Sequence, residues 1–570
     1  MKFEKIDWLF LVVTLFSVIL YGIYRSRSNR NLEGYFLGGR NMPWWLVMLS
    51  IMGTQASAIT FLTAPGQAYT DGMRFVQYYF GLPLAMVVLC ITFVPLFHRL
   101  KVFTAYEFLE RRFDVKTRML TSGLFLLSRG LSTGISIFAP SLVLHSMLGW
   151  DIYWTNLFMG GLLIIYTVTG GARAVAYTQQ LQFIIIYAAM FAAGWYAVQS
   201  LPQGISMSDA LHFAGKSGKL NVITTGFDDG GFDWKDKYNI WSGIIGGFFL
   251  ALSYFGTDQS QVGRYLTAKN LSESKKGLLM NGILKVPLQF LILLLGCLVF
   301  AYYIFFQSPA FFNRSLEQKV MKTEYANEYR QLQIRFAGIQ ENKKTTAVLL
   351  STSLKNESED SVKLFRIQLE GYESEAKECR KEIRSLIEKA LPGADANDTN
   401  YIFLHFVGDA LPAGWVGVII AIIFLAAWGS IAAALNSLSS CTLIDFHQRL
   451  RKKKMNEEES VYWGRMYTLI WGLACILIAQ FAFKIGTSLI EAVNILGSWF
   501  YGTILGIFLV AFYLKKVRSN EVFIAALVTE ILVISIYFMD VISFLWLNVI
   551  GAVGVVILSY IFNQFSKKAD

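Results

Sequence analysis

The sequence predicts an all-α polytopic membrane protein. Of its 570 residues, 54% are hydrophobic and only 16% are charged, which is far from the balance of a soluble domain. The apolar residues form long segments, and a helix that rises about 1.5 Å per residue needs roughly 20 of them to cross a bilayer. Two of these segments carry polar residues at their centres, which predicts helices that are broken inside the membrane.

About 13 segments are long and apolar enough to be transmembrane helices. They lie at residues 7–24, 43–68, 75–98, 117–147, 152–169, 178–198, 240–266, 276–305, 402–446, 461–485, 487–513, 521–539 and 541–563. The longest would overshoot the bilayer as straight helices, so we expect them to include an interfacial turn or a break.

Lysine and arginine gather in alternate connections between these segments, which predicts the orientation of the chain. Basic clusters follow the first, third, seventh, ninth and eleventh segments, and Lys567 and Lys568 follow the last. By the positive-inside rule the C-terminus is cytoplasmic, and an odd number of spans puts the N-terminus outside the plasma (inner) membrane. This topology explains the net charge of +11, so the expected partner is the lipid bilayer and not nucleic acid.

The predicted spans fall into five regions. These are an N-terminal helix and cytoplasmic loop at 1–42, a five-helix unit at 43–200, an extracytoplasmic loop at 201–239, a second five-helix unit at 240–513, and two further helices at 514–570. Residues 307–400 interrupt the second unit with a polar, charge-mixed segment of helical rhythm, which we expect to be an extracytoplasmic helical hairpin. We favour the interpretation that this insertion is a solvent-exposed addition to the fold. The alternative is that it is a contact site for another protein.

The two interrupted spans are the second, with "GTQAS" and "APG", and the seventh, with "YFGTDQSQVGR". If the two five-helix units are inverted copies, these spans are the first helix of each copy, where secondary transporters unwind to form a midplane site. Unwinding frees carbonyl oxygens that must face protein, water or an ion, and a cation such as Na+ is a natural partner. For single hydroxyls such as Thr54, bonding back to the helix is the simpler interpretation.

The ninth span presents small residues at helical spacing, including Ala426, Gly429 and Ser430. This face is compatible with a shared ion site and equally with close helix packing. Asp258 in the seventh span is costly to bury and is therefore a functional candidate. It could bind substrate hydroxyls, bind a cationic group, carry a proton, or cap the half-helix that follows the break.

Six motifs lie in and between these spans: "YFLGGRNMPWW", "ASAITFLTAPGQAY", "TAYEFLERRFD", "TGGARAVAYTQQLQ", "TDQSQVGRYLTAK" and "LNSLSSCTLID". Through them the chain resembles the sodium/solute symporter family, which includes sodium/galactose, sodium/proline and sodium/sialic acid symporters. The similarity covers nearly all of the chain except the insertion. It implies a five-plus-five inverted-repeat core with one helix before it and two after.

The resemblance also implies a Na+ site where the second and ninth spans meet. Its ligands correspond to the carbonyls of Gly53, Ala56 and Ala426 and the hydroxyl of Ser430. Gly429 stands where the family has another hydroxyl, so we expect weaker binding, with water or Thr54 in place of the lost oxygen. The ligands of a second Na+ correspond to Ala432, Ala433 and Gln179, so we expect one coupling Na+ as the only cofactor.

The family's substrate-contacting positions correspond to Gln55, Ser57, Thr60, Phe75, Tyr79, Ser132, Asp258, Gln261 and Lys285. Most of these groups are uncharged, and the arginine that holds a carboxylate in the sialic acid symporter is replaced here by Ser132. We therefore expect a neutral, hydroxyl-rich solute such as a sugar or sugar derivative, with an organic acid bound by Arg129 as the alternative.

Lys285 is expected to contact the sugar, to pair with Asp258 or to snorkel. Trp428 is a candidate gate or stacking residue.

The predicted function is Na+-coupled symport of a small polar solute by alternating access. A proton-coupled or facilitative transporter that uses Asp258 is the nearest alternative, and a transporter-like sensor is a remote one. An enzyme is not expected, because the sequence lacks a membrane-embedded His/Cys cluster or a nucleophile motif.

Overall fold

The computed structural model describes residues 4–25, 36, 39–356, 358–451, 455–482 and 487–569. In the first part of the chain the helices are α1 (Lys5–Arg25), α3 (Trp44–Gln55), α4 (Ala58–Asp71), η1 (Gly72–Tyr79), α5 (Leu82–Ile91), α6 (Phe93–Leu100), α7 (Glu107–Arg112), α8 (Val115–Leu148), α9 (Ile152–Gln199) and α10 (Met207–Lys216). A small antiparallel hairpin of β1 (Phe227–Asp228) and β2 (Gly231–Phe232) follows.

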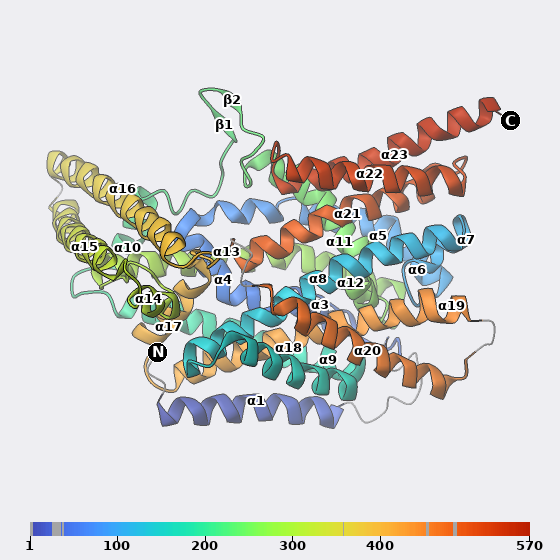
Figure 1. The fold of residues 1–570 in the computed structure, drawn as a ribbon, viewed down its shortest axis with the longest axis horizontal. Helices are drawn as coiled ribbons and strands as arrows, with labels where there is room; N and C mark the ends of the chain where they lie inside the picture. The colour runs from blue at the N-terminus through green and yellow to red at the C-terminus, as the bar shows by residue number, and fades with distance from the viewer. Residues whose placement is uncertain are drawn as a thin grey trace.

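The second part of the chain is also helical among the described residues. Its helices are η2 (Ser242–Gly246), α11 (Gly247–Thr257), α12 (Gln259–Tyr265), α13 (Leu271–Phe305), α14 (Arg314–Val320), α15 (Ala326–Lys355), α16 (Glu359–Ala390), η3 (Thr399–Tyr401), α17 (Ile402–Ala410), α18 (Trp415–Cys441), η4 (Thr442–His447), α19 (Gln448–Leu450), α20 (Glu457–Ala479), α21 (Leu489–Tyr513), α22 (Ser519–Phe538) and α23 (Phe544–Ala569). Figure 1 shows most of them running along one axis, with the two termini at opposite ends of the bundle.

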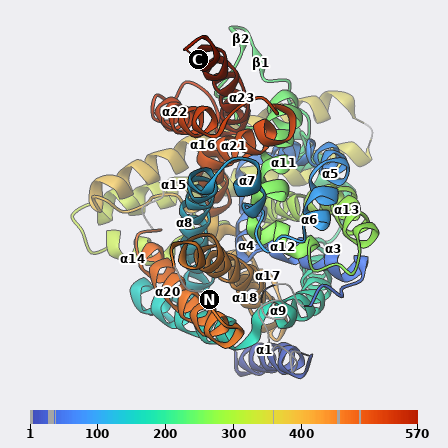
Figure 2. The ribbon, with the colours of Figure 1, turned by 90° about the vertical axis from the view of Figure 1, so that its right-hand side faces the viewer.

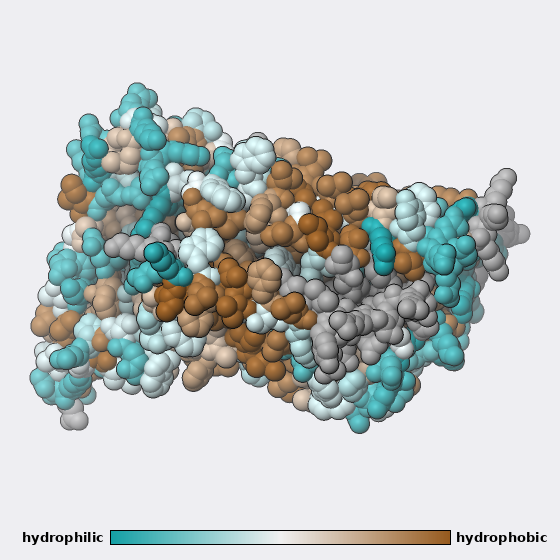
Figure 3. Space-filling view, turned by 90° about the horizontal axis from the view of Figure 1, so that it is seen from below, coloured by the Kyte–Doolittle hydropathy of each residue, from teal (hydrophilic) through white to brown (hydrophobic). Residues whose placement is uncertain are grey.

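Nine helical segments in the described ranges are long and apolar enough to cross a membrane. Two shorter apolar helices lie at Ile152–Val168 and Ser242–Thr257. On the face shown in Figure 3, apolar residues gather in the middle of the molecule and hydrophilic residues at its two ends. The chain is therefore an all-α integral membrane protein, while the number of 13 spans stays a prediction.

The predicted spans at 152–169 and 178–198 both fall within the continuous helix α9. The Tyr166 hydroxyl lies 2.8 Å from Thr178 Oγ1, although these residues are 12 positions apart. A straight helix would separate them by about 18 Å along its axis, which is beyond the reach of the two side chains. The part of α9 before Tyr166 and the part after Thr178 are therefore not collinear.

Both predicted breaks are present. Helix α3 ends at Gln55 and α4 begins at Ala58, with Ser57 extended between them at φ −77° and ψ 165°. Helix α11 ends at Thr257 and α12 begins at Gln259, with Asp258 at φ −76° and ψ 117°. The Asp258 side chain caps α12 by accepting from the Ser260 N–H, whereas Ser57 starts α4 without a side-chain cap bond. In contrast, α18 is continuous.

The insertion is a helical hairpin of α15 and α16, as expected from its sequence, and it lies at the end of the bundle that carries the N-terminus (Figure 1). A buried ion pair joins Lys343 of α15 to Glu373 of α16. The Lys343 ammonium also lies 4.8 Å from the Phe300 ring of α13. Burial opposes the ionisation of Glu373, but attraction to Lys343 and Lys219, together with the hydrogen bond from Lys343, outweighs it and holds the pKa of this carboxyl below its usual value. The hairpin is thus anchored to α13.

We expect Glu373→Leu to lower the free energy of unfolding by about 3–5 kcal/mol, because it leaves Lys343 buried without its partner. The double variant K343M/E373L should recover most of this loss. Glu382, in an exposed pair with Arg335, is the matched control, and Glu382→Leu should have no measurable effect. Thermal unfolding and limited proteolysis of the hairpin measure these effects. Wild-type stability of the Glu373→Leu variant would contradict the role of the pair.

Candidate functional site

A polar cavity of about 140 Å³ lies beside the broken helix α3–α4. Its walls come from α3, α4, η1, α5, α8, α11, α13, α18 and α21. In Figure 2, which looks along the bundle, α4, α12 and α18 lie near its centre and α1 lies at its edge. The predicted site residues that line the cavity are Gln55, Ser57, Thr60, Tyr79, Arg129, Lys285 and Ser430.

The break frees two carbonyl oxygens. In a continuous helix, the Gly53 carbonyl would accept from the Ser57 N–H, and the Ala56 carbonyl from the Thr60 N–H. Here the Ser57 N–H donates to the Gln55 carbonyl at 2.9 Å, and the Thr60 N–H donates to the Ser57 carbonyl at 3.0 Å. The Gly53 and Ala56 carbonyls therefore lose their helical donors at the two positions predicted to bind Na+.

Helix α18 supplies the facing hydroxyl. It packs against both α3 and α4. Ser430 Oγ lines the cavity and donates to the carbonyls of Ala426, at 3.0 Å, and Ala427, at 3.1 Å. Ala426 itself is buried. Gln55 and Ser57 of the break and Ser430 of α18 thus line the same cavity, whereas Gly53, Ala56 and Ala426 do not line it.

Gln179 joins three helices next to this cavity. Its amide nitrogen donates to the Gly429 carbonyl of α18 at 3.1 Å and to Thr54 Oγ1 of α3 at 3.3 Å. Its amide oxygen accepts from Ser50 Oγ at 3.0 Å. Gly53 allows this contact, because a Cβ atom there would lie 2.9 Å from the Gln179 Cβ. Gln179 therefore acts as a neutral hydrogen-bonded link between α3, α9 and α18.

Asp258 does not line the cavity and is saturated with hydrogen bonds. Its Oδ2 atom accepts from Arg129 Nη2 at 2.6 Å and from the Tyr501 hydroxyl at 2.8 Å. Its Oδ1 atom accepts from the Ser260 N–H at 2.8 Å and from Ser260 Oγ at 2.6 Å. Asp258 thus caps α12 and neutralises Arg129, and the expected pairing with Lys285 is not formed. No sequence motif indicated that Tyr501 would contact Asp258.

Lys285 is a buried cation without a counter-charge. Its side chain is 3% exposed and lines the cavity, with the ammonium 5.4 Å from the Tyr79 ring. Within the described residues, no hydrogen bond or ion pair reaches it. Asn281 and Gln289, one turn away on either side of the same helix face, are buried, and their amides have no hydrogen-bond partner in the described part of the chain.

Four predicted residues lie behind the cavity wall. Ser132 bonds back to the Ser128 carbonyl, and Gln261 donates to the hydroxyl of Tyr254. Phe75 packs against Tyr78 and Tyr79. Trp428 stacks on Tyr166, with ring centroids 6.0 Å apart, and does not line the cavity, so the predicted stacking of Trp428 on substrate is not supported.

At the end of the bundle that carries the C-terminus, a buried polar cluster surrounds Asp445. Asp445 accepts from Arg118 at 2.5 Å, from Thr104 at 2.7 Å and from Ser122 at 2.9 Å. These residues belong to η4, α8 and the segment before α7. Sequence reasoning missed this cluster, because its members are far apart in the chain.

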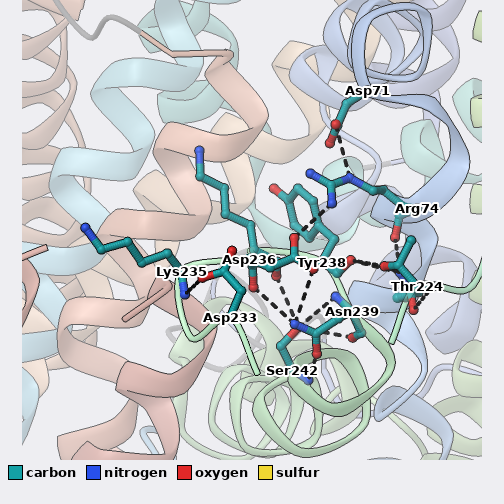
Figure 4. A network of polar contacts seen from close by, with 11 residues as sticks. Asp71, Arg74, Thr224, Asp233, Lys235, Asp236, Tyr238, Asn239 and Ser242 are labelled. Carbon is teal, nitrogen blue, oxygen red and sulfur yellow. Dashed lines mark hydrogen bonds and ion pairs between the residues drawn. The ribbon is translucent and has the colours of Figure 1, made fainter. Parts of the chain in front are cut away.

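The opposite end opens into a hollow of about 820 Å³. Figure 4 shows Arg74 between Asp71 and Asp236, and the ion pairs measure 3.1 Å and 2.8 Å. A further ion pair joins Lys237 to Glu491 of α21. The loop at 201–239 therefore connects α4 and η1 with α21.

A membrane-spanning helical bundle with two broken helices around a buried polar cavity is the architecture of a secondary transporter. The chain belongs to the sodium:solute symporter family, whose model matches residues 35–329 and 384–529. The unmatched residues between these ranges contain most of α15 and α16. It is accordingly a sodium-coupled solute transporter by family.

Known relatives agree with this assignment. The sodium/sialic acid symporter NanT of Aliivibrio fischeri is 24% identical over 98% of this chain and 93% of its own length. The human sodium/iodide cotransporter is 30% identical over 48% of this chain and 41% of its own length. A Na+-coupled sialic acid symporter solved in a substrate-bound outward-open state has the same fold, with a TM-score of 0.75 and 23% identity over 99% of this chain and 98% of that one.

We expect Asp258→Asn to lower the free energy of unfolding by about 3–5 kcal/mol, because it leaves the Arg129 guanidinium buried without its counter-charge. Tyr501→Phe removes one hydrogen bond to the same carboxylate and should cost only about 1 kcal/mol. The neutral pair R129Q/D258N should recover part of the loss. Thermal unfolding in detergent measures all three, and a fully stable Asp258→Asn variant would show that the ion pair is not a structural requirement.

Proposed function

We propose that the protein is a Na+-coupled symporter that takes up a small sugar derivative with an acidic group, by alternating access. The observation that supports this proposal is the cavity itself, which is lined by Ser57 of the helix break, by Ser430 of α18 and by Lys285, a cation with no counter-charge among the described residues. The plasma (inner) membrane is its proposed location, with the N-terminus outside and the C-terminus in the cytoplasm.

The proposed ion site uses oxygen atoms from two helices. The carbonyls of Gly53, Ala56 and Ala426 and the hydroxyl of Ser430 would hold one Na+, because hard cations prefer oxygen ligands and unwound helices supply them. A second Na+ is not proposed. At the position where a carboxylate would be needed, Gln179 presents a neutral amide whose nitrogen already donates two hydrogen bonds.

The proposed solute is acidic, because Lys285 provides the cavity's uncompensated positive charge. Arg129 is less suited to this role, since Asp258 already neutralises it at 2.6 Å. Gln55, Ser57, Thr60 and Tyr79 supply polar groups suited to sugar hydroxyls, and the buried amide oxygen of Gln55 has no partner among the described residues. This refines the neutral sugar expected from the sequence. The relatives named for sialic acid and iodide carry anions, which agrees with this refinement.

The charge of the solute sets the available driving force. One Na+ with a monoanion carries no net charge, so a tenfold Na+ gradient supplies about 1.4 kcal/mol and roughly tenfold accumulation. A neutral solute would also gain about 2.3 kcal/mol from a potential of ~100 mV, enough for several hundredfold. Proton coupling through Asp258 is disfavoured, because its carboxylate is held by Arg129, Tyr501 and Ser260.

A thermal-shift screen of the purified protein tests this proposal. Acidic sugars, neutral sugars and simple carboxylates are each added in Na+ and in K+, and we expect stabilisation by an acidic sugar only when Na+ is present. Lys285→Met should weaken binding of that solute by about 2 kcal/mol or more, roughly thirtyfold, because it removes the charge partner of the acid.

Tyr79→Phe is the matched control for the cavity wall and should retain the preference for acids, since it leaves the ammonium in place. Stabilisation by neutral sugars alone, with Lys285→Met unchanged, would refute the acidic solute. Identical results in Na+ and K+ would refute sodium coupling.

A further inference from the structure

Gly429 removes a hydroxyl from the proposed Na+ site, and another side chain occupies the space. A Cβ atom built on Gly429 would lie 2.7 Å from the amide oxygen of Gln182 and 3.1 Å from Gln179 Cγ. Gln182 belongs to α9, which packs along α18. The amide oxygen of Gln182 therefore lies close to the position that the hydroxyl of a serine or threonine at position 429 would occupy.

The Gln182 side chain is almost fully buried as a whole, and its amide lacks a hydrogen-bond partner among the described residues. The residue is 4% exposed, and neither amide atom forms a hydrogen bond with the described part of the chain. A buried amide without partners is unfavourable, so such a group calls for a ligand or water. Gln179, one turn earlier on the same helix, has both of its amide atoms hydrogen-bonded.

Thr54, the replacement expected from the sequence, is less available than Gln182. Its hydroxyl donates to the Ser50 carbonyl at 2.8 Å and accepts from Gln179 Nε2 at 3.3 Å. Of the three side-chain oxygens near Gly429 that belong to Thr54, Gln179 and Gln182, only that of Gln182 lacks a hydrogen bond within the described ranges.

We propose that the amide oxygen of Gln182 is a ligand of the coupling Na+ and replaces the hydroxyl that Gly429 lacks. The inference rests on the proposed Na+ site between α3–α4 and α18, and it extends that site to α9. Amide oxygens are suitable ligands for hard cations, and an oxygen already held in a buried position needs little reorganisation to bind.

The test measures Na+ binding directly, through the Na+ concentration that gives half of the maximal thermal stabilisation of the purified protein without solute. Choline replaces Na+ to keep the ionic strength constant. We expect Gln182→Leu to raise this concentration at least tenfold. Gln180→Leu is the matched control, because Gln180 lies on another face of α9, and it should stay within twofold of wild type.

A rescue variant separates loss of a ligand from loss of packing. In Q182A/G429S the alanine vacates the space beside position 429 and the serine supplies a hydroxyl, so Na+ affinity should return to within about threefold of wild type. Gly429→Ser alone should not improve affinity, because its Cβ meets the Gln182 amide at 2.7 Å.

The outcomes distinguish this inference from the proposed function. A wild-type protein that Na+ does not stabilise refutes the Na+ site as a whole. A wild-type protein that responds, together with a Gln182→Leu variant within twofold of it, overturns the role of Gln182 alone. If Gln182→Leu does not fold, Gln182→Glu is the deciding variant, because it keeps an oxygen atom at this position. It should bind Na+ at least as tightly as wild type. Weaker binding than wild type would overturn the inference.

Discussion

The loss of two backbone hydrogen bonds at Ala56 and Ser57 is the constraint on which the structure depends. Carbonyl oxygens freed inside a membrane cannot face lipid, so the surrounding helices must cover them with polar groups or an ion. Helix α18 packs against both halves of this broken helix, and α9 packs against α3 and α18. Gly53 and Gly429 matter here because they let the glutamines of α9 approach closely.

The buried charges explain how one cavity serves an ion and a solute. Arg129 and Asp258 neutralise each other and fix the second break, so they leave no net charge behind the cavity wall. Lys285 then remains as the one uncompensated cation among the described residues that line the cavity. In the proposed function, Lys285 would bind the acidic group of the solute and uncharged oxygen atoms would bind Na+.

Structural features that depend on short stretches of sequence were predicted well. Both helix breaks, the helical insertion and the polar lining from Gln55 to Thr60 follow from short motifs and composition. Contacts between distant segments were not predictable. Arg129 and Asp258 are 129 positions apart, and Tyr501 follows 243 positions after Asp258. The position of Trp428 against Tyr166 likewise depends on how α9 bends, which no local pattern encodes.

The most direct test of the central claim is binding of radioactive sodium to the purified protein, measured by scintillation proximity. If the freed carbonyls and Ser430 hold the coupling ion, binding saturates at about one Na+ per chain, is displaced by unlabelled Na+ but not by K+, and weakens in Ser430→Ala. Absence of saturable binding, or wild-type affinity in Ser430→Ala, would contradict a sodium site at the break between α3 and α4.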